Sequence, residues 1–243
     1  MTKIKIIIII TAIMCIASRE YHTQMQKKIS KLVFLKYSEI TEEGEDNLDK
    51  KFDSIIAEYQ KENEVKDTSM IELVKKLGMI EKLDHMAPSN IKKHIELNHD
   101  TIWKYNTQDG KTIGDLFRVE QENGMVYCHS HLDRSKIFRQ YSVMDKDQNY
   151  TLEEFPEDRK EIFGFNCYKV VIQVHDDYNE GFPTDLGDSI YEMYVTNEIQ
   201  LPLHAILNFA IKSTDFFPLE IRSWLSSIPG DQEVHLINEI IYE

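Results

Sequence analysis

Most of the chain beyond residue 88 alternates between apolar and polar positions. A period of two residues is typical of a β-strand that buries one face. In the segment 91–98, for example, Ile91, Lys93, Ile95 and Leu97 alternate with more polar neighbours. Turn residues such as Asn98-His99-Asp100 and Asn123-Gly124 separate these segments. The pattern predicts strands at about 31–40, 91–97, 103–108, 112–120, 125–132, 137–143, 162–175, 189–196, 219–225 and 234–242.

A different period governs the segment between Gly44 and Pro88. The apolar residues there recur at helical spacing and predict an amphipathic helix over 46–63. They are Leu48, Phe52, Ile55, Ile56 and Tyr59. A second helix is predicted over 69–84, because Ser69 and Glu72 form a capping box before the next apolar stripe. A third stretch of helical spacing follows Pro202, over 202–211.

Short strands joined by turns favour an antiparallel meander over alternating βα units. We therefore predict a mainly β (α+β) fold: a strongly curved antiparallel sheet, or half-barrel, of eight or more strands. The predicted helices would pack on its concave face. Residues 18–243 would form a single exported β-rich domain with a helical insertion at about 44–88.

Residues 1–17 have the layout of a secretory signal peptide. Lys3 and Lys5 give a positive start, an uncharged apolar run follows from Ile6 to Ala17, and Ala17 and Ser18 are small. The apolar run is shorter than the roughly 20 residues of a membrane span. We expect export to the periplasm or cell envelope, with cleavage after Ala17 or after Ser18.

Two alternatives stay open at this end of the chain. Cys15 would be the lipidated residue of a lipoprotein, although Met14 stands where such a site prefers a small residue. The apolar run could also remain as an uncleaved anchor.

The charge balance limits the classes of partner. The formal net charge is −14, so we expect no general electrostatic binding to nucleic acid or to an anionic membrane surface. The hydrophobic content of 42%, with 12 Tyr and 11 Phe, favours a folded domain over a disordered one.

Beyond the signal, the chain has two cysteines, Cys128 and Cys167. In an exported protein, an even pair predicts one disulfide, provided that the two strands are neighbours. The alternative is two separate buried thiols.

Candidate sites for chemistry are few. His129 and His131 would lie on one face of a strand and form a weak candidate metal site; a solvent-facing histidine pair is the simpler interpretation, because no further ligand is evident. The segment Asp145 to Asn149 is similar to the start of a calcium loop. However, Tyr150 and Pro156 occupy positions that need Gly and Glu. No catalytic motif is found, and we expect no cofactor.

Four motifs in the C-terminal third follow one another in a recognisable order. They are Gly-Phe-x-Cys-x-Lys at 164–169, Thr-x-Glu-Ile at 196–199, Pro202, and Phe-Pro-Leu at 217–219. This order, over about 150–225, resembles the GLPGLI-type envelope proteins of Bacteroidetes, although the signature itself is missing here. That family in turn resembles the half-barrel of periplasmic lipoprotein carriers, which implies a curved sheet that handles lipid.

These observations together predict a non-enzymatic cell-envelope protein. It would hold an apolar ligand such as a lipid, or a lipidated or other envelope protein, between sheet and helices. One alternative is a metal-dependent hydrolase that uses His129 and His131. The other is a structural or interaction module whose helices fill the concave face completely.

Overall fold

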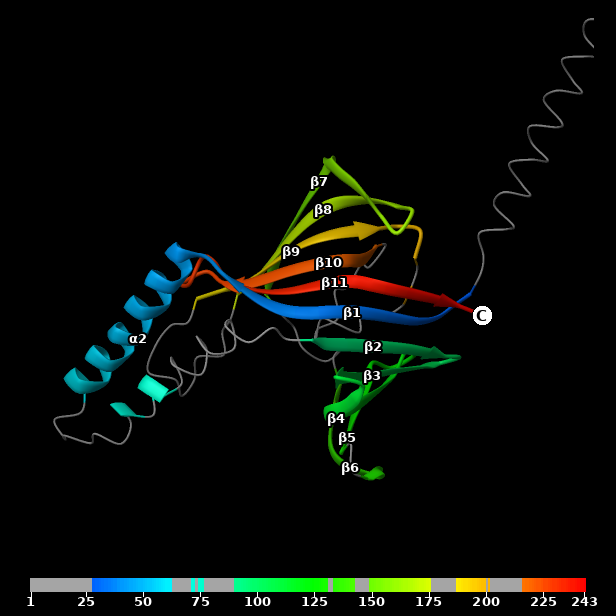
Figure 1. Ribbon diagram of the computed structural model, residues 1–243, viewed down its shortest axis with the longest axis horizontal. Helices are drawn as coiled ribbons and strands as arrows, with labels where there is room; N and C mark the ends of the chain where they lie inside the picture. The colour runs from blue at the N-terminus through cyan, green and yellow to red at the C-terminus, as the bar shows by residue number, and fades with distance from the viewer. Residues whose placement is uncertain are drawn as a thin grey trace, which may run out of the picture.

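The computed structural model describes residues 28–62, 71–72, 74–76, 90–130, 133–142, 149–175, 187–199, 201 and 216–243. Its main element is one curved antiparallel sheet of eleven strands, which confirms the predicted mainly β architecture (Figure 1). The strands are β1 (Ile29–Ile40), β2 (Ile91–Asn98), β3 (Thr101–Gln108), β4 (Lys111–Glu120), β5 (Met125–Ser130), β6 (Asp133–Ser142), β7 (Tyr150–Ile162), β8 (Phe165–Val174), β9 (Ser189–Thr196), β10 (Phe217–Leu225) and β11 (Asp231–Tyr242).

Strand β1 lies in the middle of the sheet, between β2 and β11. On one side the order runs from β2 to the edge strand β6, and on the other it runs from β11 back to the edge strand β7. Strands that follow one another in the sequence are therefore neighbours in the sheet within each half. Pairing of Phe34 with Ile237 is part of the ladder that joins the two halves.

The connection between the two edge strands requires the sheet to curl. Ser142 ends β6 and Tyr150 begins β7, so the chain between them spans at most about 28 Å. In a flat sheet, the two edges of eleven strands would lie about 48 Å apart. The edges must approach one another, and the inner, concave face of the curl carries the hydrophobic core.

The core joins side chains from both halves of the sheet, which shows that one face of the curl is inside. Residues on this core face lie at alternate positions and follow the strand register, as in the row Val170, Met193 and Ile221. The largest fully buried members include Phe34, Phe217, Leu32, Ile95, Ile102, Ile172, Met193, Leu219 and Ile221.

Helix α2 (Glu42–Glu62) confirms the helix predicted from the apolar stripe, but it begins four residues earlier than expected. Thr41 caps it, because its hydroxyl accepts a hydrogen bond from the Gly44 N–H at 3.0 Å. Leu48 of the stripe is fully buried. The first turn packs on the β10–β11 turn: a Cβ on Gly44 would lie 2.4 Å from the Gly230 carbonyl oxygen.

Helix α2 therefore attaches to one end of the sheet, where β1 ends and β11 begins (Figure 1). Residues 71–72 and 74–76 are also helical, within the second predicted helix. The rest of that helix and the segment 202–211 lie outside the described residues, as do the signal peptide and Cys15. Coverage of the concave face by these helices stays a prediction.

One strand was not predicted. Strand β7 is rich in charge and contains Pro156. The sequence pattern predicted a strand over 162–175, which corresponds to β8, but none before it over 150–161. Phe163 and Gly164, both with positive φ, form a tight turn that joins β7 and β8 in a hairpin. A register shift between Phe155 and Arg159 accommodates the proline at this edge of the sheet.

Candidate functional site

Three lysines interrupt the apolar pattern of the core face on three adjacent strands. They are Lys36 on β1, Lys93 on β2 and Lys104 on β3, and we call them the lysine row. Phe34 pairs with Lys93 across the first strand boundary, and Ile95 pairs with Lys104 across the second. Each lysine is thus a diagonal neighbour of the next, on the face that also carries Phe34 and Ile95.

Strand β11 adds an imidazole and a carboxylate beside this row. His235 pairs with Lys36 in the register and is 3% exposed. Its Nε2 is 2.6 Å from a Glu233 carboxylate oxygen, and Lys36 forms an ion pair with the other oxygen of Glu233. Because that carboxylate accepts a hydrogen bond from Nε2–H, the neutral ring leaves Nδ1 as a buried acceptor without a partner.

The pKa values reflect this arrangement of charges. Desolvation by burial would raise the pKa of Glu233, but the hydrogen bond to His235 and the charge of Lys36 lower it to about 2. Burial lowers the pKa of His235, with a further contribution from Lys93 and against the effect of Glu233.

The two remaining lysines sit where a charge is costly. Desolvation lowers the pKa of Lys93 to about 7, and the nearby charge of Lys104 lowers it in the same direction. Desolvation also lowers the pKa of Lys104 to about 8. The Lys104 ammonium lies 5.0 Å from the centre of the Phe117 ring, within the range of a cation–π contact.

The core face is packed unevenly. Some of its apolar residues are fully buried, such as Ile172, Met193 and Ile221 on β8–β10 and Ile95 and Ile102 on β2 and β3. Across β2–β4, towards the end where α2 attaches, the same face keeps half-buried side chains: Ile91, Lys93, Lys104, Asn106, Ile113 and Phe117. We call this second region the open part of the core face.

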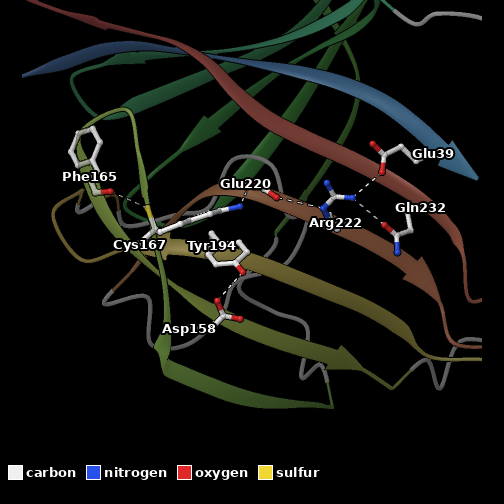
Figure 2. Close-up of polar contacts among 9 residues, drawn as sticks. Glu39, Asp158, Phe165, Cys167, Tyr194, Glu220, Arg222 and Gln232 are labelled. Carbon is white, nitrogen blue, oxygen red and sulfur yellow. Dashed lines mark hydrogen bonds and ion pairs between the residues drawn. The ribbon is translucent and has the colours of Figure 1, made fainter.

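On the opposite face of the sheet, charged residues are arranged as ion pairs across strands. Arg222 lies 2.8 Å from Glu39 and 3.4 Å from Glu220, so that it links β1 to β10 (Figure 2). Tyr194 donates a hydrogen bond to Asp158 at 3.0 Å, and desolvation together with this bond raises the pKa of Tyr194 to about 12. This network links neighbouring strands on the outer surface.

Of the predicted histidine pair, the structure describes only His129. His129 is 6% exposed, so it does not face solvent as expected. Its Nδ1 lies 2.7 Å from the Arg134 carbonyl oxygen, and its ring packs 5.5 Å from that of Trp103. His131 lies outside the described residues, and so does the segment 143–148 with the calcium-like loop. Among the residues that the structure describes, no group of three or more His, Cys, Asp and Glu is placed to hold a metal.

The cysteine prediction is corrected. Cys128 and Cys167 are both buried and both free, so the disulfide is not formed. The bridge required neighbouring strands, whereas β5 and β8 have seven strands between them in the sheet order. The Cys167 Sγ instead lies 3.6 Å from the Phe165 carbonyl oxygen (Figure 2). Desolvation raises the pKa of both thiols, that of Cys167 to about 11.

Comparison with known proteins leaves the family open. No family model matches the chain, and no curated protein matches it either. Among solved structures, the chain is similar to the Mycobacterium tuberculosis lipoprotein LppX, with 8% identity, a TM-score of 0.32, and coverage of 92% of this chain and 93% of that one. The resemblance to GLPGLI-type proteins stays a prediction.

The sequence pattern placed Lys93 among apolar positions but did not identify the lysine row. The signal was present, because Lys93 occupies the position between Ile91 and Ile95 on the inward-facing side of its strand. Lys36, Lys104 and His235 could be added only once the strand order was known, since they belong to different and non-consecutive segments.

Proposed function

We propose that this chain is a non-enzymatic, exported cell-envelope protein that holds an apolar ligand, or the lipid part of a lipidated partner, on the core face of its sheet. The observation that supports this best is the uneven packing of that face. A purely structural core would be packed throughout, but the open part keeps apolar side chains such as Ile113 and Phe117 only half-buried. Concave apolar surfaces with a few polar groups are the usual composition of ligand sites.

The proposed location rests on the N-terminal sequence. Residues 1–17 combine a positive start with an apolar run and small residues, the layout of a leader for export. Among the helices that the structure describes, none is both long and apolar enough to cross a membrane.

Native mass spectrometry of the full chain tests the proposed function. The protein is extracted gently from the envelope fraction, measured, and then incubated with oleyl alcohol and with oleate. We expect a co-purifying lipid or a retained probe of one-to-one stoichiometry. A protein that is bare and also ignores both probes would contradict the proposal and favour a module whose core face is filled by its own chain.

A matched pair of variants tests where the ligand lies. Phe117 is a half-buried residue of the open part, whereas Phe155 is 39% exposed on the edge strand β7. Phe117→Ser should weaken probe binding about tenfold, since it removes much of one aromatic contact. Phe155→Ser should leave binding unchanged. Equal effects of both variants would contradict this location.

A further inference from the structure

The lysine row has an unusual charge environment for this protein. The chain has 42 acidic residues and 28 basic ones, so carboxylates are abundant. On the opposite face, lysines of the sheet form ion pairs with carboxylates: Lys31 with Glu96, Lys160 with Glu220 and Lys169 with Glu192. A cation that lies on the core face without such a partner is therefore not explained by a shortage of acidic residues.

Lys93 is that cation. In the part of the chain that the structure describes, its ammonium group has no hydrogen bond or ion pair, although charges of both signs lie near it. The charged groups that face it are Lys36, Lys104, Glu233 and His235. The Glu233 carboxylate already accepts a hydrogen bond from His235 and forms an ion pair with Lys36, so both of its oxygens have other partners than Lys93.

An unpaired cation at a half-buried site is costly, and groups whose pKa is perturbed by burial cluster at functional sites. The lowered pKa values of Lys93 and Lys104 report the same cost. A single negative charge placed beside Lys93 would offset the cost of burying its ammonium group. Such a group would also lie against Ile95 and near Phe117, which are suited to a hydrocarbon chain and not to a free ion.

We infer that Lys93, with Lys104 beside it, binds the anionic head group of an amphiphile whose chain lies along the apolar core face. This inference rests on the proposed function and specifies its ligand class: a lipid with a carboxylate or a phosphate at one end. A lysine acts as a point charge toward either group. Neutral lipids would lose this contact.

The experiment measures binding of four probes to the full chain at pH 6.5 by isothermal titration calorimetry. Oleate is compared with oleyl alcohol, and oleoyl lysophosphatidate with monooleoylglycerol. Each pair has the same chain with and without the anionic group. The variants are Lys93→Met, Lys93→Arg, and the control Lys92→Met, because Lys92 is the exposed neighbour on the opposite face.

We expect wild type to prefer the anionic member of a pair by about tenfold or more, the value of one charge-assisted contact. The pair with the larger preference then distinguishes a carboxylate from a phosphate ligand. Lys93→Met should abolish this preference and leave neutral probes within about twofold of wild type. Lys93→Arg should keep it, and Lys92→Met should not change it. Circular dichroism checks that each variant is folded.

Two results would overturn the inference, and they are distinguishable. If anionic and neutral probes bind equally, or if Lys93→Met behaves like Lys92→Met, the chain is a ligand carrier without the charge recognition inferred here. If wild type binds none of the four probes, the proposed function fails as well.

Discussion

Individual residues in this protein are placed by the face of the sheet on which they lie. Lys92 and Lys93 are consecutive, yet the first is exposed and the second half-buried on the core face. The same alternation places Cys128 on the core face and His129 behind it, packed near Trp103. The surroundings of a residue thus depend on two things. One is the face to which it points, which follows from its alternate position along the strand and can be predicted from the sequence. The other is which strands lie beside its own, which the sequence pattern does not show.

The lowered pKa of Lys93 predicts a pH dependence of stability. The folded protein releases the proton near pH 7, whereas the unfolded chain holds it until about pH 10.5. Between these values the unfolded state binds more protons, so the free energy of unfolding should rise with pH. In Lys93→Met the free energy of unfolding should rise less with pH than in wild type. The stability of this variant relative to wild type should therefore be higher near pH 7 than at more alkaline pH.

Denaturant unfolding at pH 7 and pH 9.5 measures this effect, with Lys92→Met as the control that retains the rise. Lys104, which has a pKa lowered to about 8, contributes in the same direction and remains in all three proteins. A rise that is identical in wild type and Lys93→Met would contradict the buried-charge account of Lys93.

The free cysteines give a second prediction at this scale. Because burial raises the pKa of Cys128 and that of Cys167, to about 11 for the latter, both should stay protonated and react slowly at pH 8. Iodoacetamide should label Cys128 and Cys167 only after denaturation, as peptide mapping would show. Rapid labelling of either residue in the native protein, or a loss of 2 Da that reductant restores, would contradict the structure.

At the scale of elements, α2 is joined to the sheet through a close approach of two backbones. Gly44 in the helix and Gly230 in the β10–β11 turn leave no room for a side chain. Thr41, which caps the helix, also donates its N–H to the Gly230 carbonyl at 2.9 Å. This contact fixes the helix to the end of the sheet where the lysine row lies.

Gly44→Ala should therefore destabilise the protein by about 1–3 kcal/mol, because the new methyl group would overlap the backbone of the turn. Alanine is otherwise the better helix former by about 1 kcal/mol, so an isolated helix would respond in the opposite sense. Thermal unfolding measures the change, and Lys50→Ala on the exposed side of α2 is the control. An increase in stability for Gly44→Ala would contradict the close approach.

Sequence reasoning succeeded for elements with a clean period and failed where another principle dominated. The stripe that includes Leu48 predicted α2, and alternation predicted β2, because burial of one face sets both periods. Strand β7 was missed because an exposed edge strand needs no apolar alternation, and β7 carries charge and Pro156 instead. The disulfide prediction was wrong because the alternation along a strand indicates the face on which a cysteine lies, but not which strands are neighbours in the sheet.

For the whole molecule, curvature is what connects the residues into a site. The short connection between β6 and β7 requires the sheet edges to approach, and the resulting concave face collects the lysine row, His235 and the apolar core. Neither the strand order nor this convergence follows from local patterns, since β1 pairs with β11 across almost the full length of the chain. The candidate site could therefore be recognised only in three dimensions.

Covalent capture of a bound lipid tests the central claim, that the open part of the core face holds an apolar ligand. The full chain is incubated with a fatty acid carrying a diazirine on its chain, irradiated, digested and mapped by mass spectrometry, with excess oleate as competitor. We predict oleate-sensitive adducts on β2–β4, at core-face residues such as Ile113 and Phe117. Adducts confined to exposed residues of the edge strand and hairpin, such as Phe138 and Phe163, would contradict the account.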